Sequence, residues 1–364
     1  MHNTPYIYYT NGIDRSVHSD ALSFIAKLHN VAMVTDRFGY LNKYSIWNLD
    51  PTIKDIPVET TENFSDILDK EIQKVLDLNE DVYVSWSGGI DSSCILCGFL
   101  NSDMDLTKLH VIYSDVSIED FPSLYDKLLS LNVDLIKSTS DTIESIYEES
   151  LSKGVLCTGW HGDQLYGRWI LQMHPSIANM HWKDACFYLG ASDAAVSQLE
   201  EAFKFYNLNI ETGAQFCWWQ GFFTCWYERA GSEYILGKGY DDKVIDIFGS
   251  EAFQSWSITR YKNKELLADT SSLGCKPEMK DYIYSVVKDA QWRDSRIKSS
   301  IGPSVFINKP MLFIVTSEGI IRIKHPTKVH PARYHFVFTR LSQDYLPRYK
   351  KDSSWNVFTN MINI

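Results

Sequence analysis

The stretch of sequence that is most informative about the fold is Val82-Tyr83-Val84-Ser85-Trp86-Ser87-Gly88-Gly89-Ile90-Asp91-Ser92-Ser93. Its first part, residues 82–86, is a short run rich in β-branched and aromatic residues, which predicts a strand. Apolar residues at positions 95, 96, 99 and 100 follow at helical spacing and predict a helix. The glycine-containing segment over 87–92 is therefore expected to be a loop that joins a strand to a helix.

The sequence around this loop alternates between helix-like and strand-like patterns. Helical spacing of apolar residues predicts helices over 63–78, 123–131 and 142–151, and short apolar runs predict strands over 109–113, 133–136 and 155–157. Strands that alternate with helices form a parallel sheet with helices on both faces. Because residues 177–290 show mostly helical patterns, the predicted fold is α/β with a mostly helical C-terminal part.

Residues 1–58 are predicted to form a separate unit. They contain a helical pattern over 21–28 and a strand-like run over 31–34, and a polar connector over 50–55 follows. We therefore expect an N-terminal extension over 1–58 and an α/β domain over 59–364.

The composition is that of an ordinary globular protein. Of the 364 residues, 45% are hydrophobic and 22% are charged, which excludes extensive disorder. No apolar run of about eighteen residues occurs and the first residues do not resemble a secretory signal, so we expect no membrane span and a cytoplasmic location. The net charge of -11 argues against a broad electrostatic grip on nucleic acid, although a local basic groove is compatible with it. The seven cysteines are expected to be reduced thiols.

The loop over 87–92 has the chemistry of a pyrophosphate site. Consecutive glycines free the backbone and remove side chains that would block an anion. The loop amides, the hydroxyls of Ser87 and Ser92 and the positive end of the next helix would face the same volume. The Asp91 carboxylate would repel phosphate on its own but suits a Mg²⁺ ligand. The alternative is a tight turn in which serine or aspartate only caps the helix.

This hexapeptide resembles the pyrophosphate-binding loop of the ATP-pyrophosphatase (PP-loop) superfamily, whose members cleave ATP to AMP and pyrophosphate while adenylating a substrate. A second segment is Val155-Leu156-Cys157-Thr158-Gly159-Trp160-His161-Gly162-Asp163-Gln164-Leu165-Tyr166-Gly167. It is similar to the S-G-E-G-S-D-E-x-F-G loop in the synthetase domain of asparagine synthetases and β-lactam synthetases.

The resemblance implies an adenine nucleotide α-hydrolase-like fold and an AMP-forming carbon–nitrogen ligase. ATP and Mg²⁺ would adenylate a small carboxylate, and an amine, or ammonia from a separate source, would then displace AMP to form an amide. The residues implied to bind the nucleotide are Ser87, Gly88, Gly89, Asp91, Ser92, Tyr113, Thr158 and Gly159. The implied Mg²⁺ ligands are Asp91 and Asp163.

Two lysines match shorter family patterns. Lys264 begins a segment similar to a K-x-x-L-R helix start, and Lys298 lies in a segment similar to an R-x-K stretch. In the family the second lysine supports the departing pyrophosphate, where one well-placed donor is worth about 10²–10³ in rate. The alternative for both residues is a solvated surface position.

The sequence departs from the family at two places. Trp160 replaces the catalytic glutamate and has no group that accepts a proton, so His161 becomes the candidate base, with a structural hydrogen-bonded role as the alternative. Residue 2 is His2 where the family's glutaminase half begins with cysteine, so we expect no ammonia-generating domain. Residues 35–39 nevertheless echo a D-R-F-G sequence of that half, so 1–58 is either its remnant or an unrelated extension.

The remaining candidates have a structural interpretation that we favour. Cys94 and Cys97 are expected in the core rather than at a sulfur or cluster site, and Trp218-Trp219 in the core rather than in a pocket wall. His325, His330 and His335 are expected at the surface rather than on a metal. Two other functions stay open: adenylation of a nucleobase or tRNA base, and an inactive descendant that binds nucleotide as a sensor or scaffold.

Overall fold

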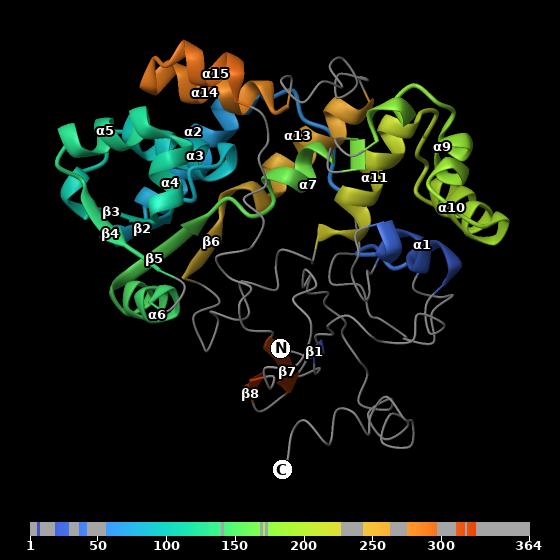
Figure 1. The fold of residues 1–364 in the computed structure, drawn as a ribbon, viewed down its shortest axis with the longest axis horizontal. Helices are drawn as coiled ribbons and strands as arrows, with labels where there is room; N and C mark the ends of the chain where they lie inside the picture. Colours follow the sequence, from blue (N-terminus) through green and yellow to red (C-terminus); the bar gives the residue numbers. More distant parts are fainter. Residues whose placement is uncertain are drawn as a thin grey trace. The chain divides into compact units, whose positions relative to one another are not determined.

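The computed structural model describes residues 6–7, 19–28, 36–41, 56–139, 142–167, 170–171, 174–226, 243–262, 275–296, 311–316 and 319–324. The chain divides into two compact units, drawn in Figure 1. Unit 1 comprises residues 1–56, 169–238 and 306–364, and unit 2 comprises residues 57–168 and 239–305. Each unit is assembled from separate segments of the chain. The predicted boundary between an N-terminal extension and an α/β domain at residue 58 stays a prediction.

Unit 2 is built on a parallel sheet of five strands in the order β4-β3-β2-β5-β6. The strands are β2 (Asp81–Ser85), β3 (Leu109–Tyr113), β4 (Asp134–Lys137), β5 (Gly154–Thr158) and β6 (Val244–Asp246). The central strand β2 pairs Val82 with Leu109 of β3 and with Val155 of β5. Its three middle residues are buried, as expected for a strand covered on both faces.

The connections between these strands explain why helices cover both faces. A right-handed crossover puts a helix on one face when the chain moves outward from β2 to β3 and β4, and on the opposite face when it returns to β5. Accordingly α3 (Ile90–Asn101) and α5 (Pro122–Ser130) lie on one face and α6 (Ile143–Lys153) lies on the other (Figure 1). The other helices of unit 2 are α2 (Phe64–Leu76), α4 (Asp115–Asp120), α7 (Gly162–Tyr166), α13 (Glu251–Lys262), α14 (Pro277–Val287) and α15 (Ala290–Ser295).

The strand order places a reversal point between β2 and β5. The chain leaves β2 in one direction along the sheet and reaches β5 from the other side, so the two following loops diverge at the carboxyl ends of these strands. Ligands of open α/β sheets bind in the crevice that forms at such a point. The segments after β2 and β5 begin at Trp86 and Gly159, so both predicted nucleotide loops start at this edge.

Unit 1 is largely helical in its described part. It contains α1 (Asp20–Leu28), α9 (Trp182–Tyr188), α10 (Asp193–Phe205) and α11 (Gly213–Thr224). It also holds a sheet in the order β1-β7-β8, with antiparallel strands β1 (Tyr6–Ile7), β7 (Met311–Thr316) and β8 (Gly319–Lys324). Every residue of α11 is buried, including Trp218 and Trp219, so the interpretation of this aromatic segment as core is confirmed.

The predicted α/β class is correct, and the predicted strands β2 to β5 form within a residue or two of their expected positions. The strand β6 was not predicted, because its three residues carry no pattern of their own and it joins the sheet from a distant part of the chain. The predicted strand over 31–34 lies outside the described residues. Within the described part of the chain, no helix is long and apolar enough to cross a membrane.

Candidate functional site

The predicted Mg²⁺ ligands Asp91 and Asp163 meet on one lysine. The Nζ of Lys276 donates to the carboxylate of Asp91 and, over 2.6 Å, to Oδ1 of Asp163. Asp91 lies in the first turn of α3 and Asp163 in the first turn of α7, so each carboxylate comes from the segment after its strand. The loops after β2 and β5, 72 residues apart at these positions, therefore form one site.

The first loop needs glycine at position 88. Gly88 has a φ of +78°, and a Cβ on it would lie 2.7 Å from both the Asp120 Cβ and the Ser117 carbonyl oxygen. The loop is closed by its serines: the amide of Ser87 donates to the Ser92 hydroxyl over 3.1 Å, and the two hydroxyl oxygens are 3.0 Å apart. Gly89 is the residue before α3 and provides no side-chain cap. The backbone N–H groups in the first turn of α3 are therefore not capped by this residue.

The second loop packs directly against the first. A Cβ on Gly162 would overlap the Asp91 carboxylate, and a Cβ on Gly159 would lie 3.1 Å from the Asp91 carbonyl carbon. These glycines let the loop approach closely enough for Asp91 and Asp163 to share a cation. Glycine at 162 is thus required by the neighbouring loop, and glycine at 159 avoids a tight contact with it.

Lys276 is held in the site by its backbone. It precedes Pro277, the first residue of α14, and it has left-handed backbone angles with a φ of +52°. Such angles are unfavourable for a residue with a Cβ and persist where surrounding contacts determine the position. Burial of the ammonium lowers the pKa of Lys276, but the charges of Asp163 and Asp91 outweigh burial, so the net pKa lies above its ordinary value.

The candidate base His161 is paired with an acid. Its Nδ1 contacts the carboxylate of Asp246, the last residue of β6, and the two side chains are only 3% and 6% exposed. Asp246 lies beside Thr158 in the register of β5 and β6, so the short strand β6 is what brings this carboxylate to the second loop. A carboxylate on one ring nitrogen orients an imidazole and stabilises its protonated form.

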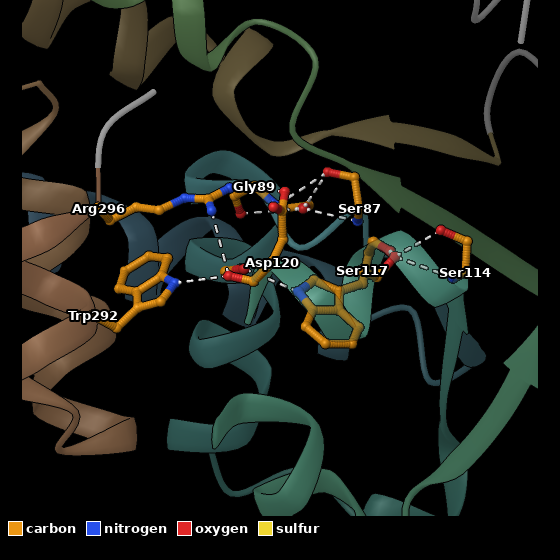
Figure 2. Close-up of polar contacts among 10 residues, drawn as sticks. Ser87, Gly89, Ser114, Ser117, Asp120, Trp292 and Arg296 are labelled. Atoms are coloured by element: carbon orange, nitrogen blue, oxygen red, sulfur yellow. Dashed lines mark hydrogen bonds and ion pairs between the residues drawn. The ribbon is translucent and has the colours of Figure 1, made fainter. Parts of the chain in front are cut away.

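A second ion pair borders the first loop. Figure 2 shows Trp292, within α15, and Arg296, which directly follows this helix, directed at Asp120. Arg296 donates to the Asp120 carboxylate over 2.9 Å, and the Trp292 indole donates to the Asp120 carbonyl over 3.2 Å. Since a Cβ on Gly88 would meet Asp120, this ion pair fixes the helix α4 that the glycine loop packs against.

Two nucleotide residues implied by the resemblance lie at the expected edge of the sheet. Tyr113 is the last residue of β3, and its carbonyl accepts from the amide and the hydroxyl of Ser138. Thr158 is the last residue of β5; it is 2% exposed, and its hydroxyl has no hydrogen-bond partner within the described ranges. The strands thus bring the implied adenine and AMP segments to the same edge as the glycine loop.

The other predicted candidates fall into two groups: residues that the structure does not describe, and cysteines that are buried in the core. Lys264, Lys298 and the histidines 325, 330 and 335 lie outside the described residues. Cys94 and Cys97 are fully buried in α3, and burial raises the pKa of both thiols, so their interpretation as core residues is confirmed.

Three residues of this site were missed by sequence reasoning. Asp246 follows an unremarkable apolar pair, Arg296 was noted only as part of the segment around Lys298, and Lys276 carries no motif that we assigned. The one local signal for Lys276 is the proline after it, which marks a helix start and so a defined backbone position.

The donor set fits Mg²⁺ bound together with phosphates. Mg²⁺ in nucleotide sites is held by one or two carboxylates, with the remaining positions filled by phosphate oxygens and water. In this structure Asp91 and Asp163 share one cation, the Lys276 ammonium, which shows that the two carboxylates are close enough to hold a common positive charge. Among the residues that the structure describes, no group of three or more metal-ligating side chains occurs.

Comparison with models of known protein families gives no match for this sequence, and comparison with curated protein sequences gives none either.

Proposed function

We propose that this protein is an ATP- and Mg²⁺-dependent ligase that adenylates a small carboxylate, releases pyrophosphate and forms an amide with an amine or ammonia. The observation that carries the proposal is the convergence of Asp91 and Asp163 on one cation at the carboxyl ends of β2 and β5. Two acidic residues that meet beside a glycine loop support a metal–triphosphate site more directly than either loop does alone.

The glycine loop supports the binding of the β- and γ-phosphates. Gly88 and Gly89 carry no side chains over the loop amides, and the hydroxyl oxygens of Ser87 and Ser92 lie 3.0 Å apart within the loop. The N-terminus of α3 points to the same place and adds the positive end of its dipole. A nucleotide held in this way would place its α-phosphate toward the second loop, where Thr158 and Gly159 lie.

Asp91 and Asp163 would hold the metal. When bound, Mg²⁺ supplies charge neutralisation of the phosphate oxygens and of the departing pyrophosphate. In the first half-reaction an oxygen of the substrate carboxylate attacks the α-phosphorus, and the bond to the β-phosphate oxygen breaks to release pyrophosphate. The two aspartates act in this step by fixing the triphosphate in line with the carboxylate.

His161 is the residue proposed to serve the second half-reaction. The amine attacks the carbonyl carbon of the acyl-adenylate, AMP leaves, and the proton lost from nitrogen goes to the imidazole. The contact with Asp246 would orient the ring and stabilise its protonated form. This role replaces the family glutamate, whose position is occupied by Trp160.

A protein that binds nucleotide without turnover is the second candidate. It is favoured by Trp160 at the family glutamate position and by Lys276, which already neutralises part of the charge of both aspartates. Such a protein would bind ATP in the same loop, so binding alone does not distinguish the two functions.

Pyrophosphate release by the full chain tests the proposal. The assay contains ATP, Mg²⁺ and a pool of the proteinogenic amino acids and short dicarboxylic acids, with ammonium or hydroxylamine as the amine. We expect release that falls by about 10²-fold or more in Asp91→Asn and in Asp163→Asn, because the phosphates lose their metal. The exposed Asp126→Asn on α5 is the matched control and should retain activity. Binding of ATP without release under every condition would favour the second candidate.

A further inference from the structure

Lys276 is the one cation that the described residues place on both aspartates, and neither loop resemblance assigns it a role. Its side chain is 3% exposed, while the Asp91 and Asp163 side chains are 25% and 18% exposed. The lysine therefore approaches the carboxylates from the protein side, and the partly exposed carboxylates are the groups that a ligand can reach.

The charge balance of this cluster depends on the ligand. These two carboxylates and the Lys276 ammonium together carry a formal charge of −1. A divalent cation added alone would reverse the sign and place an uncompensated positive charge in a partly buried site, which is unfavourable. A triphosphate brings several negative charges, and these can accept both the metal and the ammonium. The metal is thus expected to bind well only together with the nucleotide.

The covalent geometry allows the exchange. The backbone of Lys276 is restrained by its left-handed angles and by Pro277, but its side chain has four methylene groups and rotates as a flexible stem. The ammonium can move from the carboxylates to a neighbouring phosphate while its Cα stays in place. The aspartates would then be released to the metal without any shift of α14.

We propose that Lys276 is the resident counter-ion of Asp91 and Asp163 in the nucleotide-free protein, and that it yields their carboxylates to a divalent metal only when a triphosphate arrives. The inference rests on the proposed function, because it takes the two aspartates as the metal ligands. It adds that metal and nucleotide bind as one unit and that the lysine enforces this order.

Binding of Mn²⁺, followed by electron paramagnetic resonance of the free ion, tests the inference. The full chain is titrated with MnCl₂ alone and with MnCl₂ plus α,β-methylene-ATP, which is not cleaved between its α- and β-phosphates. We expect the native protein to bind Mn²⁺ tightly only with the nucleotide. Lys276→Met removes the charge at similar length, so we expect it to bind Mn²⁺ alone about tenfold or more tighter than the native protein does. Lys74→Gln, at an exposed lysine paired with Glu71, is the control and should behave as the native protein.

A second variant covers the case in which Lys276→Met does not fold. Lys276→Arg keeps the charge and offers a planar fork to both carboxylates, so it should weaken Mn²⁺ binding even with nucleotide present. Equal Mn²⁺ affinity of Lys276→Met and the native protein without nucleotide would overturn the inference, as would unchanged affinity in Lys276→Arg. If the native protein binds no Mn²⁺ even with the nucleotide, the proposed function itself fails and the inference fails with it.

Discussion

The imidazole of His161 lies against the carboxylate of Asp246, and both side chains are almost completely buried. The pair joins the loop after β5 to the last residue of β6, two segments that are far apart in the sequence. The second carboxylate oxygen of Asp246 has no hydrogen-bond partner within the described ranges. Since a buried carboxylate without full hydrogen bonding is unfavourable, the pair carries a cost in stability that a functional role would explain.

The proposed base separates the two half-reactions. We expect His161→Gln to slow amide formation from ammonia by about 10²–10⁴-fold, because the attacking amine loses its proton acceptor. Hydroxylamine is already unprotonated near neutral pH and attacks without a base, so hydroxamate formation by His161→Gln should stay within a few-fold of the native rate. Pyrophosphate release with hydroxylamine should be similarly retained. Parallel assays of amide and hydroxamate products measure the split.

The control for this prediction is Asp246→Asn, which keeps the shape of the side chain but removes its charge. It should reduce amide formation less than His161→Gln does and should leave the hydroxamate reaction unchanged. Equal loss of both products in His161→Gln would mean that the imidazole only supports the loop, and the proposed base would have to be sought elsewhere.

A residue of this site could be predicted from the sequence where its partners are close to it in the chain, and not where they come from distant segments. The loop after β2 carries its own signal, because the strand, the glycines and the helix are continuous in the chain, and Asp91 could be named from it. The second loop was found by resemblance, and its contact with the first follows from the parallel order of the strands. Lys276 and Asp246 could not be named, because their roles arise only when α14 and β6 fold against these loops.

The fold likewise contains elements that local sequence patterns predict and one element that they do not. Strands β2 to β5 are separated by helices of ordinary length, so hydrophobic periodicity predicts each of them. The strand β6 has three half-buried residues and follows a long helical region, and no period can be read from so short a segment. Its existence depends on pairing with β5, which is a property of the folded sheet.

The buried thiols give a prediction that bears on the alternative of a tRNA-modifying enzyme. Burial raises the pKa of Cys94, Cys97 and Cys157 well above the ordinary value, so their reactive thiolate forms are scarce at neutral pH. We expect the native protein to resist iodoacetamide at pH 8, with these three cysteines reacting only after denaturant is added. Raising the pH to 9 should increase their labelling in the native state very little, because the raised pKa values keep them protonated.

Mass spectrometry of tryptic peptides after timed labelling measures each cysteine separately. The denatured protein is the control, since its thiols should all react with the pH dependence of an ordinary cysteine. Rapid labelling of Cys94 or Cys97 in the native protein at pH 8 would contradict the core assignment and would return sulfur chemistry to consideration.

The ion pair between Arg296 and Asp120 is largely buried, so we expect it to contribute to the free energy of unfolding. Their side chains are 12% and 19% exposed, and Arg296 also packs beside Trp292, whose ring stacks on Phe121 at 3.9 Å between centroids. Removing one partner leaves the other partly buried and unpaired, so we expect Arg296→Gln and Asp120→Asn each to lower the free energy of unfolding by about 1–3 kcal/mol. The double variant should lose less than the sum of the two, with a coupling of about 1 kcal/mol or more.

Urea unfolding of the native chain, both single variants and the double variant gives this coupling, provided that the slope of the transition stays constant. The exposed pair of Lys153 and Glu149 on α6 serves as the matched control, and its cycle should give a much smaller coupling, because solvent screens an exposed ion pair. Because Asp120 lies against Gly88, a strong coupling would also mean that α15 supports the glycine loop through α4. Strictly additive effects at Arg296 and Asp120 would show that the two side chains act independently, and the loop would then depend on its own hydrogen bonds for its shape.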